Sequence, residues 1–191
     1  ALWLGGAAVA RDYFTPTGWS GQGTVKGKAV LAGYGLDEPA LGFDDYQGLD
    51  VKGKVVVVRR FTPEPPELEK PLDAKDARRA GDLRKKAFAA RNRGAKALVV
   101  VDWPLPPPSR PKEWAPPSEA KFPALRVEGP GDAGLPVVLV TRKALEKLWP
   151  TLEKKQSIDV ELSVSLRFEQ TEAFNVVATL AGTTAGLPPL F

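Results

Sequence analysis

Apolar and polar residues follow patterns along the chain that predict several strands. Over 157–168, SIDVELSVSLRF, every second residue is apolar, which predicts a long strand with one buried and one solvated face. Three shorter runs are almost continuously apolar: KVVVV at 54–58, KALVVV at 96–101 and LPVVLVT at 135–141. Such runs predict strands that are buried on both faces. Two further strands are expected at 25–35 and 174–182.

A helical period lies between the first two of these runs. The segment AKDARRAGDLRKKAFAARNRG predicts one helix over 74–93, which Asp73 or Asp76 can cap and Gly94 can end. On a helical wheel, Ala80, Leu83, Ala87 and Ala90 share a stripe, and Arg78, Lys85, Lys86 and Arg93 are assigned to the opposite side. We expect the stripe to pack closely on a sheet and the basic side to face solvent. A shorter helix is predicted over 142–155, interrupted or ended by Pro150.

The succession of strand, helix and strand over 54–101 is typical of a crossover unit and predicts an α/β (α+β) fold. Residues 1–24 show no regular period and are predicted to form an irregular N-terminal flank. The domain itself is expected over 25–170. Residues 171–191 are expected to supply a C-terminal strand and a tail.

Histidine and cysteine are both absent from the chain. Histidine is the commonest general base and a common zinc ligand, so a Ser-His-Asp triad, a Cys-His dyad and an HExxH zinc helix are excluded. Disulfides and thiolate zinc sites are excluded as well. We therefore predict that this chain is not itself an enzyme and holds no cofactor.

The net charge and the short apolar opening limit the classes of partner that we expect. The net charge of +4 is small, and the basic helix carries no interleaved aromatic residues, so no nucleic-acid partner is expected. The apolar opening ALWLGGAAVA is shorter than the roughly 20 residues that span a bilayer, so no membrane insertion is expected. Methionine is absent even at position 1, which favours a processed product or an excised fragment.

The stretch LGFDDYQGLDVKGKVVVV, residues 41–58, holds three acids that invite a catalytic interpretation. A carboxylate-based hydrolase would use Asp44, Asp45 or Asp50. Adjacent acids point to opposite sides of an extended chain, however, and no second carboxylate pair is evident. The other interpretation is that the acids accept backbone N–H bonds in turns before a buried strand. Calcium binding in this loop is a third possibility.

A proline-rich loop over 102–123 is the best candidate for an interaction surface. Proline segments cost little entropy to order on binding, and tryptophans supply large contact areas. The candidate contact residues are Trp103, Pro107, Arg110, Trp114 and Phe122. In the alternative interpretation both tryptophans pack onto the domain and fasten the loop.

Five segments follow one another over roughly 28–182: VLAGYG, DDYQGLDVKGKVVVV, ARNRGAKALVVV, PVVLVT and FNVVATLAG. Their order resembles the protease-associated (PA) domain of M28-family zinc aminopeptidases. The resemblance implies a β-sandwich or open barrel flanked by two or more helices. It also implies a structural role for the landmark residues Asp44, Asp45, Tyr46, Asp50, Gly53 and Gly94.

In that family the PA domain accompanies a catalytic domain that binds zinc, and a His-x-Asp metal motif follows shortly after the segment like NVVATLAG. The resemblance implies a non-catalytic lid or recognition module for peptide or protein substrates, excised from its enzyme, with zinc only in the parent's catalytic domain. Its expected partners are the substrate and the adjacent catalytic domain. It implies an extracellular, periplasmic or cell-envelope location. The alternative is a free-standing module that binds peptide or protein.

Overall fold

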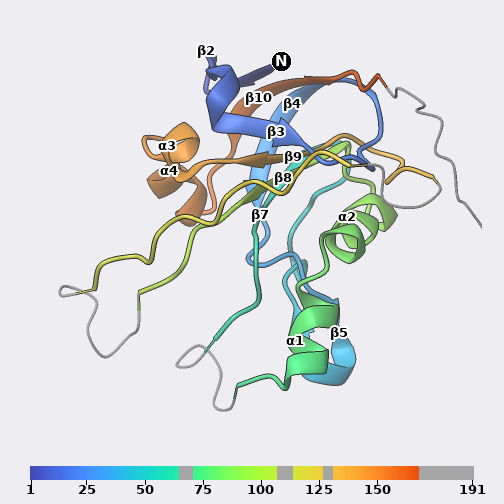
Figure 1. The fold of residues 1–191 in the computed structure, drawn as a ribbon, viewed down its shortest axis with the longest axis vertical. Coiled ribbons are helices and arrows are strands. Elements are labelled where there is room, and N and C mark those ends of the chain that lie inside the picture. The colour runs from blue at the N-terminus through green and yellow to red at the C-terminus, as the bar shows by residue number, and fades with distance from the viewer. Residues whose placement is uncertain (65–70, 107–113, 127–130, 168–191) are drawn as a thin grey trace, which may run out of the picture.

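The structure, a computed structural model, describes residues 1–64, 71–106, 114–126 and 131–167. A mixed sheet of eight strands curls into a half-barrel (Figure 1). The spatial order of its strands is β2 (Ala7–Ala8), β1 (Leu2–Leu4), β10 (Ile158–Val164), β4 (Gly23–Leu31), β7 (Val55–Arg59), β8 (Ala97–Val101), β9 (Val137–Val140) and β3 (Phe14–Pro16). A separate two-stranded ribbon pairs β5 (Asp37–Glu38) with β6 (Phe43–Asp44).

Four helices flank the sheet: α1 (Ala74–Ala80), α2 (Leu83–Asn92), α3 (Arg142–Leu145) and α4 (Trp149–Glu153). Two short 3₁₀ segments, η1 (Arg11–Tyr13) and η2 (Pro39–Leu41), complete the regular structure of the described residues. The predicted α+β architecture, an open barrel flanked by helices, is confirmed.

The four central strands, β4, β7, β8 and β9, are parallel, whereas the outer pairings are antiparallel. Helices α1 and α2 form the crossover from β7 to β8, as the sequence predicted. The carboxyl ends of the parallel strands therefore open at one edge of the sheet. The segments that leave β4, β7 and β8 meet there, and ligands of open α/β sheets bind at such an edge.

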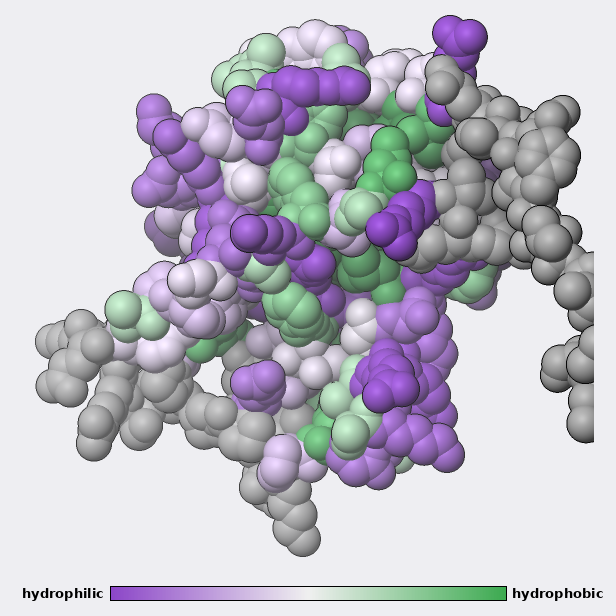
Figure 2. Space-filling view, in the orientation of Figure 1, coloured by the Kyte–Doolittle hydropathy of each residue, from purple (hydrophilic) through white to green (hydrophobic). Residues whose placement is uncertain are grey.

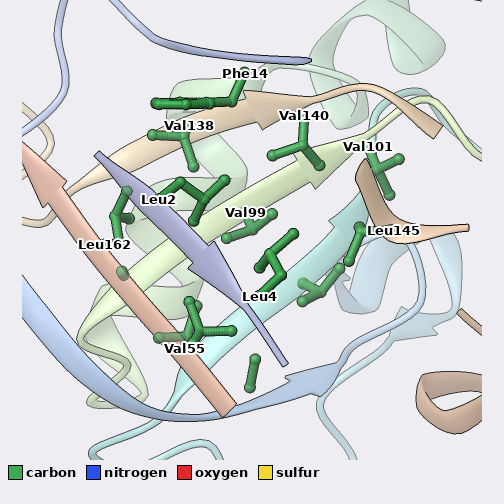
Figure 3. Packing of buried hydrophobic residues seen from close by; sticks show 14 of the residues in the cluster. Leu2, Leu4, Phe14, Val55, Val99, Val101, Val138, Val140, Leu145 and Leu162 are labelled. Carbon is green, nitrogen blue, oxygen red and sulfur yellow. The ribbon is translucent and has the colours of Figure 1, made fainter. Parts of the chain in front are cut away.

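Alternating side chains of the buried strands supply two separate cores. Val55 and Val57 of β7 pack in a first core cluster with β1, β10, α3 and α4, and Figure 3 shows Leu2, Leu4, Val99 and Leu145 converging there. Val56 and Val58 pack on the other face in a second core cluster, together with Ala87 and Ala90 of α2. All four valines are fully buried, so the predicted strand with two covered faces is confirmed.

The long alternating strand is confirmed as well, because the apolar positions of β10 are buried and the positions between them are not. The strand expected at 174–182 lies outside the described residues. The structure corrects the irregular flank expected over 1–24. Leu2 and Leu4 are buried, and β1 pairs antiparallel with β10. Strand β1 has only three residues, which is too short to show a period in the sequence.

The single helix predicted over 74–93 is in fact two helices. Asp73 caps α1 by accepting a hydrogen bond from the backbone N–H of Asp76 at 2.7 Å. Asp82 caps α2 in the same way through the N–H of Lys85 at 3.0 Å. Aspartate is more stable at a helix cap than in a helix interior, and Gly81, just before Asp82, also disfavours a continuous helix. One helix therefore ends and the next begins at these two residues. Gly94 follows α2 with a φ of +82°, as expected of a glycine that ends a helix.

The prediction that Lys86 faces solvent is wrong, because its side chain is only 1% exposed. Lys86 lies three residues after Leu83, and Ala87 and Ala90 lie four and seven residues after it. These spacings define one helical face, so Lys86 shares the buried stripe.

The helix predicted over 142–155 is also divided, into α3 and α4. Pro150 lies in the first turn of α4, where its missing N–H is tolerated, so it begins a helix and does not end one. No described helix is long and apolar enough to cross a bilayer. The surface over α1 and β5 is mostly hydrophilic in Figure 2. Glu38 of β5 forms ion pairs with Arg79 of α1 and with Lys85 of α2.

Candidate recognition cleft

A cleft of about 560 Å³ opens at the carboxyl ends of β7 and β8. Its walls come from the segments that follow β4, β7 and β8 and from the proline-rich stretch beyond them. About half of the lining residues are aromatic or proline: Tyr34, Phe61, Trp103, Pro104, Pro106, Trp114 and Pro117. Arg59, Arg60, Thr62, Glu64 and Asp102 provide the main polar groups of the walls.

Trp103 is anchored by a stack of aromatic rings. Its ring lies 4.3 Å from that of Trp149, with 17° between the two planes. Trp149 is fully buried in the first core cluster, and the guanidinium of Arg59 lies 5.3 Å from its ring centre. Trp103 therefore both packs onto the domain and lines the cleft. Phe61 is 50% exposed, so its ring is open to a ligand.

The far limb of the proline-rich stretch is held by a network of charged hydrogen bonds. The buried carboxylate of Asp102 accepts bonds from the guanidinium of Arg142 at 3.0 Å and from the backbone N–H of Ala120 at 2.7 Å. Arg142 also donates to the Pro117 carbonyl at 2.6 Å. Arg60 donates to the carbonyl of Ala120 at 3.2 Å and to that of Lys121 at 2.9 Å. These contacts give residues 117–121 a defined place at the edge of the cleft.

Lys86 reaches from α2 to the end of β7. Its ammonium group donates to the carbonyls of Arg59 at 2.9 Å, Arg60 at 3.0 Å and Phe61 at 2.5 Å. These carbonyls belong to the segment that forms one wall of the cleft. The ring of Tyr34 lies 5.9 Å from the ammonium nitrogen. Burial lowers the pKa of Lys86 to about 7, and the charge of Asp45 opposes that shift.

We expect Lys86→Met to remove a pH dependence of stability between about pH 7 and pH 9. In this range folded Lys86 releases a proton that the unfolded chain keeps up to about pH 10.4. Because the unfolded state binds more protons, the free energy of unfolding rises with pH, by up to about 1.4 kcal/mol per pH unit. Urea unfolding of both proteins at several pH values measures the two slopes. Equal slopes would contradict the prediction.

The range ends at pH 9 because burial also raises the pKa of Tyr46, which adds an opposite slope at higher pH. The amino group of Ala1 has a pKa lowered by burial and adds a small slope of the same sign as Lys86. Both groups are present in the wild type and in the variant, so their contributions cancel in the comparison.

All three acids of residues 41–58 take part in turn hydrogen bonds. Asp45 accepts the backbone N–H groups of Tyr34 and Leu36, both at 2.9 Å, and burial raises its pKa. Asp44 accepts the N–H of Tyr46 at 3.1 Å. Asp50 is fully exposed; it accepts the N–H of Lys52 at 3.2 Å and the ammonium of Lys54 at 2.9 Å, and the Lys54 bond is the main reason its pKa is lowered. None of the three lines the cleft.

The remaining landmark residues occupy tight structural positions. The ring of Tyr46 is buried beneath Arg93, whose guanidinium lies 4.6 Å from the ring centre. Arg93 also pairs with Asp37 and Asp44 and so fastens the β5–β6 ribbon to the end of α2. Gly53 donates its N–H to the carbonyl of Gly94 at 2.8 Å, and its φ is +73°. Both glycines therefore adopt a conformation that side chains disfavour.

The structure brings together only part of the predicted interaction set. Trp103 and Trp114 both line the cleft. Phe122 instead packs against the second core cluster, and Pro107 and Arg110 lie outside the described residues. Three features of the site were not predicted: Tyr34, the wall after β7 and Lys86. The carboxyl edge of a parallel sheet indicates the first two, but the spatial order of strands is not visible in the sequence.

Among the described residues no group of three or more His, Cys, Asp or Glu side chains could hold a metal ion. The cleft instead presents aromatic rings beside arginines that are bound to carbonyls or stacked on rings. This arrangement suits contact with a ligand.

The sequence pattern of the PA domain family matches residues 6–148, about three quarters of the chain. The chain belongs to the PA domain family. PA domains are accessory and non-catalytic, in agreement with the resemblance seen in the sequence.

One similar solved structure is the aminopeptidase from Aneurinibacillus sp. strain AM-1, with a TM-score of 0.56 and 17% identity. The match covers 86% of this chain and 30% of that chain, so this PA domain corresponds to less than a third of the aminopeptidase. At this identity the likeness shows the fold. A comparison with curated proteins gives no match.

Proposed function

We propose that this PA domain is the substrate-recognition module of a zinc-dependent aminopeptidase of the M28 type, joined in one chain to the catalytic domain. The observation that carries the proposal is the aromatic cleft at the carboxyl edge of the parallel strands. The solved aminopeptidase with a similar fold over part of its chain supports the same assignment. In this role the domain holds a peptide or protein substrate, and the catalytic domain supplies the zinc.

The chemistry of the walls defines the class of ligand. Arg60 donates to two backbone carbonyls, and Asp102 is paired with Arg142, so both side chains already have protein partners. Tyr34, Phe61 and Trp114 line the cleft with aromatic rings. Aromatic surfaces in a concave site bind large apolar side chains. The expected ligand is an extended peptide with a leucine or an aromatic residue seated in the cleft.

Fluorescein-labelled pentapeptides of the form Gly-Gly-Xaa-Gly-Gly test this assignment by fluorescence anisotropy. We expect the peptides with Phe or Leu at Xaa to bind more tightly than those with Ala, Asp or Lys. Trp114→Ala should weaken binding of the Phe peptide about tenfold, because it removes one aromatic wall. Phe88→Ala is the matched control, since Phe88 is 38% exposed on α2 and does not line the cleft. Equal binding of all five peptides would count against recognition in this cleft.

A free-standing peptide-binding module is the second candidate. It would use the same cleft as its binding surface. The native gene distinguishes the two candidates. A His-x-Asp motif shortly beyond the codon for Phe191 supports the aminopeptidase, whereas a stop codon there supports the free-standing module. The extracellular or cell-envelope location stays a prediction, which fractionation of the source cells tests.

A further inference from the structure

Lys86 is unusual because its charged side chain is buried and, within the described part of the chain, forms no ion pair with an acid. Its neighbour on α2, Lys85, pairs with the carboxylate of Glu38, whereas Lys86 donates to three carbonyl oxygens. Burying an ammonium group is costly unless hydrogen bonds compensate it. Its three hydrogen bonds go to consecutive residues, the last residue of β7 and the two that follow it. The buried charge therefore organises the wall of the cleft.

We propose that Lys86 is a positioning residue for the cleft, whose three hydrogen bonds hold Arg59, Arg60 and Phe61 in the path that forms one wall. As a statement about ligand binding, the proposal rests on the proposed function. As a statement about the wall, it rests on the contacts alone. The ammonium form donates three hydrogen bonds, one to each carbonyl. A neutral amine has two protons and leaves one of the three carbonyls without its donor.

The cleft therefore becomes sensitive to pH in the neutral range. The charged and titratable groups facing Lys86 are Asp45 from the turn before β7, Tyr34 from the turn after β4, and Arg59 at the end of β7. Glu38 and Lys85 line the small hollow beside it. Burial lowers the pKa of Lys86 to about 7. Ordinary Asp, Glu, Tyr and Lys side chains have pKa values well below or well above this one, so they titrate at other pH values. The chain has no histidine, and the amino group of Ala1, whose pKa is also lowered by burial, is present in the wild type and in every variant.

An NMR titration of the ligand-free protein from about pH 5.5 to pH 9 tests the positioning role, because it follows each backbone amide separately. We expect the amides of Arg60, Phe61 and Thr62 to shift with a midpoint near 7 in the wild type and not in Lys86→Met. Lys85→Met is the matched control on the same helix and should keep the titration. A Lys86 that kept the ordinary pKa of a lysine would give no midpoint in this range.

Asp45→Asn is a second variant, which keeps an oxygen that accepts the N–H groups of Tyr34 and Leu36. Because it removes the charge that favours the ammonium form, the midpoint should move to lower pH. This shift decides the question if Lys86→Met does not fold. Absence of any midpoint at Arg60–Thr62 in the wild type, or a midpoint that persists in folded Lys86→Met, would overturn the proposal.

The affinity of the Phe pentapeptide extends the test to binding. We expect it to fall by about three- to tenfold between pH 6 and pH 9 in the wild type, the loss typical of one hydrogen bond, and to stay constant in Lys86→Met. A peptide that binds equally at both pH values overturns the pH-sensitive cleft while the proposed function stands. A local titration without peptide binding at any pH supports the positioning role and counts against the proposed function.

Discussion

Replacing Trp149 by alanine is expected to lower the free energy of unfolding by about 3–5 kcal/mol, the range for a large aromatic side chain removed from a core. The ring is fully buried between α4 and the sheet, and it is the platform on which Trp103 stacks at 4.3 Å. Its removal leaves a cavity and frees one wall of the cleft. Urea unfolding measures the first effect, and the anisotropy of the Phe pentapeptide measures the second.

Trp149→Phe is the informative control for this variant. The indole N–H of Trp149 has no hydrogen-bond partner among the described residues, so phenylalanine removes an uncompensated donor while it keeps most of the packed ring. We expect its effect on stability to be much smaller than that of the alanine variant. A large loss in Trp149→Phe and a small one in Trp149→Ala would show that packing at this ring does not support the fold.

Replacing Asp102 by asparagine is expected to cost about 3–5 kcal/mol, because removal of one partner from a buried ion pair leaves the other charge uncompensated. Asp102 is buried, and its carboxylate receives both Arg142 and the backbone N–H of Ala120. The same change should loosen residues 117–121. Urea unfolding and hydrogen exchange of the Ala120 amide report these two effects.

Asp159→Asn is the matched control for Asp102→Asn, since it breaks an ion pair with Lys28 that lies in solvent on neighbouring strands. Exposed pairs contribute at most about 1 kcal/mol. Equal losses from the two substitutions would contradict the assignment of Asp102 as the anchor of the proline-rich stretch.

Together these anchors explain how a proline-rich stretch can serve as a wall of the cleft. Trp103 is fixed at its near end by the stack on Trp149, and residues 117–121 are fixed at its far end by Arg60, Asp102 and Arg142. Contacts at both ends reduce the entropy that a ligand must remove on binding. A preformed cleft is what the proposed recognition of peptides requires.

Local patterns in the sequence determined much of this fold. The valine runs predicted β7, β8 and β9, because a strand covered on both faces excludes polar side chains whatever its neighbours are. The alternation of β10 and the caps at Asp73 and Gly94 are equally local, since each depends on residues within one turn or one strand. The absence of histidine excludes whole classes of active site by composition alone, because no arrangement of the chain can supply the missing imidazole.

Only the tertiary structure decided where the cleft lies and what supports it. The spatial order of strands brings the ends of β4, β7 and β8 together, and that order depends on pairings between residues far apart in the chain. For the same reason the three residues of β1 became a strand only through pairing with β10 and β2. Lys86 closes the basic run of Arg84 and Lys85 in the sequence, and its role became visible only through three carbonyls at the end of another element. Hydrogen bonds and burial arise from proximity in space, which a local pattern does not specify.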